Sequence, residues 1–120
     1  MTDQSYPKSA RLRRQAEFDS VYQGTVFAAD NVLVIRACRN DIGVTRLGLS
    51  VSRKVGNAVV RNDWKRRIRE AFRKQRLEMP LGMDMIVRPK KGAVCDYQAI
   101  HRSIGRLAVR LDKNLKREQA

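Results

Sequence analysis

Basic side chains are the residues in this 120-residue chain whose types and spacing most clearly suggest chemistry. Ten Lys and Arg residues and only two acidic ones lie between positions 53 and 76, a net charge of +8 in a chain whose net charge is +14. Such a one-sided cluster attracts a polyanion, with nucleic acid as the first candidate and an anionic membrane as the second. Because the clearest apolar run, residues 32–35, is far too short to span a bilayer, we expect no membrane partner.

Residues that catalyse reactions or bind metals in other proteins are scarce here. His101 is the only histidine, and no motif beside it supports zinc binding, Ser-His catalysis or Cys-His catalysis. Cys38 and Cys95 have no CxxC spacing, so we expect two free thiols in a reducing compartment. Residues 1–9 are polar and lack the apolar core of a signal peptide, which favours a cytoplasmic protein. We therefore assign no catalytic residue to the chain.

A helix that follows a glycine turn must position the basic cluster. Gly56 opens the turn, and Asn57 is the expected N-cap of the helix. At about 100° per residue, the apolar residues that follow fall in one stripe, so we expect them to pack in the core. That stripe contains Val60, Trp64, Ile68, Ala71 and Phe72.

The other two faces of this helix are charged. Asp63 and Arg67 have the i,i+4 spacing and order that favour an ion pair. Glu70 and Lys74 repeat that arrangement on the same strip of the helix. The face opposite the apolar stripe is predicted to meet anions, and Asn62 lies among its basic residues. Those basic residues are Lys65, Arg66, Arg69, Arg73 and Arg76.

One strand is predicted before the basic helix and one after it. In residues 45–52, Leu47, Leu49 and Val51 point to one side, and small or polar residues point to the other. Small residues on a sheet face leave room for a flat group to lie across it. Residues 83–89 form the next strand, and a strand–helix–strand unit of this length predicts a parallel pair.

The rest of the chain predicts two more helices and two more strands. Residues 15–23 place Phe18, Val21 and Tyr22 on one helical face. Gly24 is expected to end that helix in the left-handed conformation. Either aromatic ring suits core packing, but two rings one turn apart also suit base stacking. Strands are predicted at 25–28 and 31–39. A last helix is predicted from an N-cap at Asp96 to about residue 116, and Gly105 within it marks close packing.

Residues 55–73 read VGNAVVRNDWKRRIREAFR, and here the chain resembles the bacterial ribonuclease P protein subunit family. That family carries Arg-Asn-Arg-x-Lys-Arg in this helix, after a Lys-x-Gly-Asn type turn and before Ile-Arg-Glu-Ala-Phe. Asp63 stands where the family has its second Arg. The likeness extends to the helix at 17–24 and the strand at 47–52, and covers roughly residues 11–115. The residues that match the motif are Arg61, Asn62, Lys65 and Arg66.

The resemblance implies a fold and a function. The fold would be a single-domain α+β sandwich in the order α-β-β-β-α-β-α, which is a ribosomal-protein-like fold. Its βαβ crossover would be left-handed, although such crossovers are almost always right-handed. The domain would span residues 11–116, between a flexible tail at 1–10 and a frayed end at 117–120. The protein would be the accessory subunit of the ribonucleoprotein that removes the 5′ leader from precursor tRNA. Catalysis would reside in the partner RNA with its bound Mg²⁺.

The resemblance also implies a set of site residues. The single-stranded leader would lie in a cleft between the sheet and the first helix, formed by Phe18, Tyr22, Ser50, Ser52, Lys54 and Asn57. The basic helix would contact the catalytic RNA through Arg61, Asn62, Lys65, Arg66, Arg69 and Arg73. The amide oxygen of Asn62 would touch the water shell of a Mg²⁺ ion. The expected partners are therefore the RNA subunit and the leader, and not DNA.

Two other functions are consistent with the sequence. A non-catalytic RNA-binding module, such as a ribosomal protein or an RNA chaperone, would share the basic helix without needing the aromatic pair. DNA binding through the basic helix is weaker as a hypothesis, because no helix-turn-helix pairing accompanies that helix. Reconstitution with a ribonuclease P RNA separates an accessory subunit from the first alternative.

Overall fold

The computed structural model describes residues 10–24 and 26–119 of the chain. Within these residues, three helices and four strands follow the predicted order α-β-β-β-α-β-α. Residues 1–9 of the predicted tail lie outside the described residues, whereas Ala10, assigned to the same tail, is buried. The elements are α1 (Gln15–Gln23), β1 (Val26–Ala29), β2 (Leu33–Arg39), β3 (Arg46–Leu49), the short turn η2 (Arg53–Val55), α2 (Ala58–Gln75), the short turn η3 (Arg76–Glu78), β4 (Met83–Pro89) and α3 (Tyr97–Gln119).

A mixed four-stranded sheet lies at the centre of the molecule, in the strand order β1-β2-β4-β3. β1 pairs with β2, and β2 with β4, in antiparallel register, whereas β3 and β4 are parallel. The strand–helix–strand pattern predicts this parallel pair, which α2 connects. β3 is shorter than predicted, because the chain turns into η2 soon after the Ser50 N–H donates to the Val87 carbonyl at 3.0 Å.

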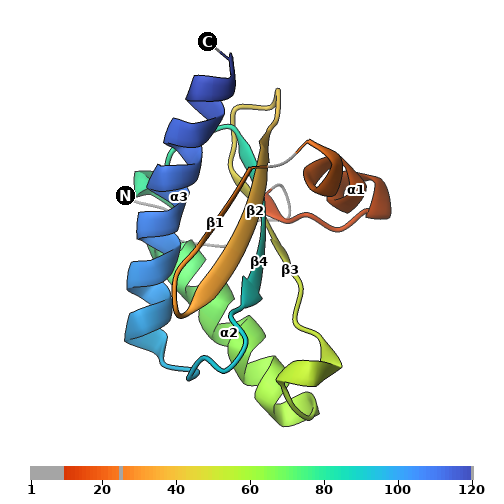
Figure 1. Ribbon diagram of the computed structural model, residues 1–120, viewed down its shortest axis with the longest axis vertical. Coiled ribbons are helices and arrows are strands. Elements are labelled where there is room, and N and C mark those ends of the chain that lie inside the picture. The colour runs from red at the N-terminus through yellow and green to blue at the C-terminus, as the bar shows by residue number, and fades with distance from the viewer. Residues whose placement is uncertain (1–9, 25, 120) are drawn as a thin grey trace.

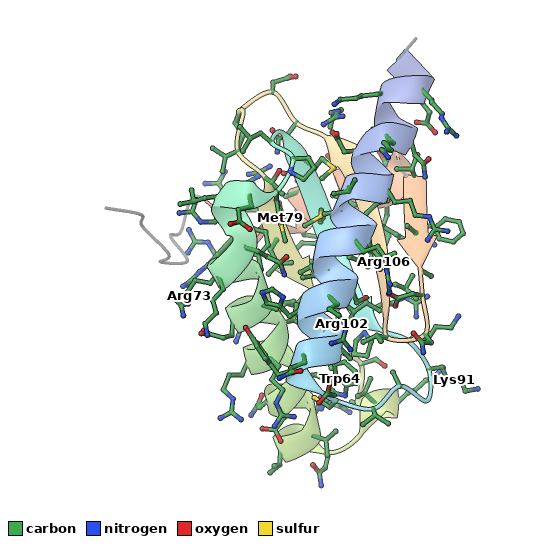
Figure 2. All side chains as sticks on the ribbon, turned by 90° about the vertical axis from the view of Figure 1, so that its left-hand side faces the viewer. Trp64, Arg73, Met79, Lys91, Arg102 and Arg106 are labelled. Atoms are coloured by element: carbon green, nitrogen blue, oxygen red, sulfur yellow. The ribbon has the colours of Figure 1, made fainter. Side chains whose placement is uncertain are left out.

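Helices cover both faces of the sheet: α2 and α3 lie on one face and α1 lies on the other (Figure 1). α2 and α3 run side by side, as a view onto that face shows (Figure 2). Val60, predicted to belong to the core stripe of α2, is instead 38% exposed, because it lies in the first turn of the helix against Gly56. The other residues of that stripe are buried in the main core as predicted: Trp64, Ile68, Ala71 and Phe72.

Residues at the helix ends behave largely as the sequence predicts. The side chain of Asn57 accepts a backbone N–H of the first turn of α2 at 3.0 Å, which confirms it as the N-cap. Asp96 accepts a first-turn N–H of α3 at 2.9 Å in the same way. Gly24 ends α1 as expected, but its φ of −107° is not left-handed. Its N–H donates to the Ser20 carbonyl at 3.2 Å, which closes the last turn without a left-handed residue.

Gly105 lets α2 and α3 approach each other closely, as predicted. A Cβ atom on Gly105 would lie 2.5 Å from Oε1 of Gln75. The Nε2 of Gln75 in turn donates to the carbonyl of His101 at 2.9 Å, so the contact joins the two helices. α3 continues to Gln119, past its predicted end near residue 116. No helix in the described part of the chain has an apolar stretch long enough to cross a bilayer.

Candidate nucleic-acid interface

A groove of about 490 Å³ opens between α1, β3 and α2. Its walls come from segments that are far apart in the sequence: the residues before α1, α1 itself, β3 and the middle of α2. Aromatic, aliphatic and basic side chains share the groove, and none of its lining residues is acidic. The lining residues are Arg11, Leu12, Arg13, Phe18, Leu47, Leu49, Lys65 and Arg69.

Gly48 of β3 lets an aromatic ring form one wall of this groove. A Cβ atom on Gly48 would lie 2.8 Å from the ring of Phe18 and 3.1 Å from the Cβ of Leu12. Only glycine therefore allows the Phe18 ring to lie this close to the strand. The sequence predicts room for a flat group on this strand face, and at Gly48 the protein's own ring fills it. Phe18 is half-buried, so it packs on the sheet and still lines the groove.

The residues before α1 run beside β3 and place two arginines on the groove. The Leu12 N–H donates to the Leu47 carbonyl at 3.0 Å, and Arg11 forms a parallel bridge with Leu47. The Leu12 side chain is buried, whereas Arg11 and Arg13 on either side of it are exposed and line the groove. Neither arginine belongs to the predicted site. The alternation of charged, apolar and charged residues at 11–13 is the signal that could have indicated their role.

An ion-pair network beside the groove ties α1 to the sheet. Arg46 donates to the two carboxylate oxygens of Asp84 at 2.8 and 2.6 Å, and to Glu17 at 2.6 Å. Glu17 also accepts the backbone N–H groups of Arg13 and Arg14 at 3.1 and 3.0 Å. The hydrogen bonds from Arg14 and Arg13, together with the charge of Arg46, lower the pKa of Glu17. α1 is thus fixed to the sheet by charge as well as by apolar contact.

α2 contributes two cations to the groove, Lys65 and Arg69. Among the residues that the structure describes, neither of them forms an ion pair, so both charges are available to an anion. The sequence assigns Phe18 to a leader cleft and these two residues to a separate basic surface, but the structure places all three in one groove. Of the other predicted RNA contacts on α2, Arg61 is half-buried and Asn62 is exposed.

The predicted ion pair between Asp63 and Arg67 is wrong. Asp63 pairs with Arg66, at 3.2 Å, so one cation of the predicted basic face is partly neutralised within the helix. Arg67 turns toward the segment before α3, where it donates to the carbonyl oxygen of Cys95 at 3.0 Å and to its Sγ at 3.2 Å. Sequence spacing alone could not show whether Asp63 pairs with Arg66 or with Arg67, because Cys95 competes with Asp63 for the Arg67 guanidinium.

The predicted pair between Glu70 and Lys74 is confirmed, at 3.8 Å. Glu70 also forms a closer ion pair with Arg73, which the sequence places on the basic face. The hydrogen bond from Arg73 lowers the pKa of Glu70, so this carboxylate stays charged beside the basic residues. Arg66 and Arg73 are thus each paired with a carboxylate of α2, whereas Lys65 and Arg69 are the cations of α2 that line the groove.

A second groove, of about 590 Å³, lies beside the first turn of α2. Ser52 and Lys54, which the sequence predicts to share a cleft with Phe18, line this second groove instead. Val60 and Trp64 are among its apolar lining residues. The other basic residues that line it, Arg88, Lys90 and Lys91, are not in the predicted site, although the Lys90-Lys91 pair is a visible basic signal in the sequence.

The remaining residues of the predicted leader cleft line neither groove. Ser50 is half-buried and is held by its backbone hydrogen bond to β4. Asn57 caps α2. Tyr22 is 46% exposed, and its ring centre lies 5.7 Å from the guanidinium carbon of Arg36, which sequence reasoning did not single out. The predicted cleft is therefore distributed over two grooves and an exposed aromatic surface.

Asn62 could reach a metal ion through a water molecule. It is exposed on α2, and the neighbouring carboxylate of Asp63 is engaged by Arg66. Among residues 10–24 and 26–119, no group of three or more His, Cys, Asp or Glu residues could hold an ion. Because hydrated Mg²⁺ keeps several waters and takes few protein ligands, an exposed amide oxygen suits contact with its water shell.

Known proteins resemble this chain in both sequence and structure. The family model described as Ribonuclease P matches residues 6–112. The ribonuclease P protein component of Geobacter sp. (strain M21) is 40% identical over 115 residues, which cover 94% of this chain and 97% of that protein. The RNase P protein of Staphylococcus aureus has a similar structure, with a TM-score of 0.76, 34% identity, and coverage of 88% of this chain and 97% of that one. The RNase P protein of Thermotoga maritima gives a TM-score of 0.75, 30% identity, and coverage of 83% and 96%.

Proposed function

Because this chain belongs to the ribonuclease P protein family and is the protein subunit of that tRNA-processing endoribonuclease, we propose that its groove between α1, β3 and α2 binds the single-stranded 5′ leader of precursor tRNA. RNA is its partner, and the protein alone is not the catalyst.

One observation carries the proposal: an aromatic ring and four cations line one groove. Phe18 offers a π-face, on which any base can stack, while Arg11, Arg13, Lys65 and Arg69 surround it with positive charge. Single-stranded nucleic acid binds to this combination, with stacking for the bases and cations for the phosphates. A duplex, whose bases are already stacked in pairs, could not use the ring.

Holding the leader would help the reaction by positioning the substrate. The scissile phosphodiester joins the leader to the tRNA, so a protein that fixes the leader restricts the movement of that bond in the catalytic RNA. The remaining cations of α2, among them Arg61, Arg66 and Arg73, would anchor the protein to the phosphates of the RNA subunit. Ser52, Lys54 and Asn57, which lie outside the groove, would extend this contact around the start of α2.

Mg²⁺, held mainly by the RNA, would stabilise the negative charge that develops on the reacting phosphate. On the protein side, the exposed amide oxygen of Asn62 would accept a hydrogen bond from the water shell of such an ion. We place this activity in the cytoplasm. We assign the chain no DNA partner, since each proposed contact is made with an unpaired RNA strand or with the catalytic RNA.

Reconstitution tests the proposal directly. The protein is combined with a bacterial ribonuclease P RNA and magnesium, and its effect on substrate affinity is measured with leader-bearing and leaderless tRNA. We expect mature 5′ ends only when the RNA is present, and loss of most of the protein-dependent affinity gain when the leader is absent. An equal gain for both substrates would refute leader binding. Absence of any functional complex with the RNA would favour the non-catalytic RNA-binding module.

Two matched double variants identify the groove. Lys65→Gln with Arg69→Gln removes two charges from the groove, whereas Arg102→Gln with Arg110→Gln removes two charges from the exposed side of α3. The first variant should lose the leader-dependent gain, and the second should keep it. Equal losses would mean that net charge, and not the groove, attracts the leader.

A further inference from the structure

α3 carries a strip of basic side chains on the side opposite the one that it buries in the main core. All the Lys and Arg residues of this helix are exposed, and at about 100° per residue they fall within a sector roughly 120° wide. The α3 strip extends for roughly 22 Å, at 1.5 Å per residue. Two of its members are labelled in Figure 2, which looks onto this side of the molecule. The strip consists of Arg102, Arg106, Arg110, Lys113, Lys116 and Arg117.

No acidic residue interrupts the α3 strip. Asp112 is buried beside it, where it accepts a hydrogen bond from Arg39 of β2 at 2.6 Å. Glu118 is exposed, but it projects roughly 80° beyond the edge of the strip. The side of α3 that meets solvent therefore presents one sign of charge.

Most of this charge is not neutralised within the protein. Arg106 pairs with Asp30 at 2.9 Å, and Lys116 pairs with Asp112 at 3.0 Å, yet these two basic side chains are still 65% and 68% exposed. Among the residues that the structure describes, the other four cations of the strip form no ion pair. Those four are Arg102, Arg110, Lys113 and Arg117.

Such an arrangement lowers the stability of the helix. Arg102, Arg106 and Arg110 follow one another at i,i+4 spacing, as do Lys113 and Arg117, and like charges at this spacing repel each other. A surface that only has to be soluble mixes both signs of charge. The one-sided row is therefore better explained by an anionic ligand than by solvation.

The shape and composition of the α3 strip indicate which anion it fits. No aromatic residue lies in its sector, so it has no ring on which an unpaired base could stack. Double-stranded RNA is recognised mainly through its shape and its phosphates, because its bases are already paired. A straight row of cations without a stacking ring suits such a duplex better than a single strand.

We propose that the α3 strip binds the phosphate backbone of a double-stranded segment of the RNA subunit. No residue of α3 lines the groove between α1, β3 and α2, so the strip and the groove are separate surfaces. The body of the tRNA is joined to the leader and stays on the groove side, which leaves the strip to the RNA subunit. The proposal goes beyond leader binding and requires only that RNA is the partner of this chain.

The salt dependence of binding to the RNA subunit tests the strip. The wild-type protein and the double variant Arg102→Gln with Arg110→Gln are bound to a bacterial ribonuclease P RNA, without tRNA, over a range of salt concentrations. In the variant, the plot of log affinity against log salt should become less steep by about 2, roughly one unit for each phosphate contact that is lost. A stem of the RNA that the wild type protects from hydroxyl radicals should become accessible in the variant complex.

Two matched variants separate the position of the charges from their number. Arg102→Lys with Arg110→Lys keeps both charges and should keep the wild-type slope, because a phosphate also binds Lys as a point charge. Adding Glu118→Arg to the double Gln variant restores the net charge of +14 at a position outside the strip, so the slope should stay reduced. Thermal unfolding should show the double Gln variant to be no less stable than the wild type, since it loses only repulsive neighbours.

The outcomes distinguish the strip from the groove. A reduced slope that Glu118→Arg does not restore supports the strip. An unchanged slope in the double Gln variant, a slope that Glu118→Arg restores, or an equal loss in the Lys variant overturns it. Unchanged binding to the RNA subunit, with equal losses of affinity for leader-bearing and leaderless tRNA, also overturns it, because the strip would then hold the body of the tRNA.

Two further results bear on what the strip binds. Loss of protection only in single-stranded segments of the RNA subunit overturns the assignment to a duplex. If the wild-type protein does not distinguish leader-bearing from leaderless tRNA while the double Gln variant still shows the reduced slope, the leader groove is refuted and the α3 strip is supported.

Discussion

The two faces of the sheet differ in what holds them together. On the face covered by α2 and α3, twenty of the described residues form one buried apolar core. On the face covered by α1, Leu12, Val21 and Ile86 are the described residues that are buried in a cluster of their own, and Arg46 links α1 to the sheet through Glu17 and Asp84. One face therefore provides most of the stability, and the other leaves exposed rings and cations for a ligand.

This difference has a physical reason. Apolar area that is fully buried stabilises the fold but cannot contact a partner, whereas a ring that stacks on a base must stay accessible to it. α2 contributes to both functions, because Trp64 and Phe72 enter the core while Lys65 and Arg69 line the groove. Changes in the core should therefore lower stability without changing RNA specificity, whereas changes to the cations that line the groove should change binding more than stability.

Trp64→Ala should give the largest effect on the core face. Trp64 is buried, so truncation removes its contacts and leaves a cavity, and the free energy of unfolding should fall by about 3–5 kcal/mol. Chemical denaturation measures this loss. Val60→Ala, on the exposed first turn of the same helix, is the control and should change stability by about 0.5 kcal/mol or less. At a temperature where Trp64→Ala stays folded, leader affinity should match that of the wild type; a parallel loss would contradict the separation of the two faces.

Arg46→Met should affect both stability and binding. It leaves buried Asp84 without its cation, so the free energy of unfolding should fall by about 3 kcal/mol. It also releases Glu17, and with it the ion pair that ties α1 to the sheet, so leader affinity should fall too. Adding Asp84→Asn removes the unpaired charge and should recover part of the stability. If the stability falls while leader affinity does not change, apolar contacts alone position α1.

Phe18→Ala should weaken leader binding by about 1–3 kcal/mol, because one base loses its stacking partner. Phe18→Leu is the matched variant: it keeps apolar contact with Gly48 and Leu12 but has no π-face. Titration of the ribonucleoprotein with leader-bearing tRNA should show similar losses for both variants, whereas thermal unfolding should show the larger loss for Ala. Full leader affinity in Phe18→Leu would show that the ring serves packing and not stacking.

Asp30 should make the core face sensitive to acid. Its carboxylate accepts the backbone N–H groups of Val32 and Leu33 at 2.8 and 2.9 Å, Ser103 Oγ at 2.7 Å and Arg106 Nη2 at 2.9 Å. Burial opposes ionisation, but these hydrogen bonds, led by those of Leu33 and Ser103, lower the pKa of Asp30 from 3.8 to about 2. The lowered pKa stabilises the fold above pH 3.8, and this contribution is lost as the pH falls toward 2.

The loss should reach about 2 kcal/mol at most, from a pKa shift of that size. Urea unfolding of the protein between pH 2 and pH 5 measures it. Asp30→Asn should be less stable at pH 5 and should lose less stability on acidification. Leader affinity at neutral pH should not change, because Asp30 joins the β1–β2 connection to α3 on the core side. An identical pH dependence in the variant would assign the acid sensitivity to other carboxylates.

The sequence predicts the elements of this fold because their signals are local. The boundaries of α1, the Asn57 cap and the parallel β3–β4 pair all follow from spacing within a short segment. The groove is different, since residues 11–13, Phe18, β3 and the middle of α2 meet only after folding. Sequence spacing therefore identified Phe18, Lys65 and Arg69 individually but could not show that they share a site.

Side-chain competition explains the other differences between sequence and structure. The Asp63–Arg67 spacing is ideal for an ion pair, but Arg67 finds a carbonyl acceptor on Cys95, in a segment remote in the sequence. Ser52 and Lys54 lie beyond the end of β3, where the chain has turned into η2 and faces the second groove. Each such outcome depends on contacts between distant segments, which no local pattern records.

Asp63→Arg should give the smallest effect and tests how far the binding surface extends along α2. Asp63 now neutralises Arg66, so the substitution both frees that cation and adds another beside it. If this part of α2 meets RNA, the plot of log affinity against log salt should become steeper by about 1–2, one unit for each additional phosphate contact. Glu118→Arg makes the same charge change near the end of α3, where the residue is exposed and is not among those that line the groove, and it should leave the slope unchanged. Equal steepening in both variants would mean that RNA binding follows net charge. If the slope does not change in Asp63→Arg, the part of α2 that binds RNA does not include Asp63 and is confined to the groove side of the helix, where Lys65 and Arg69 lie.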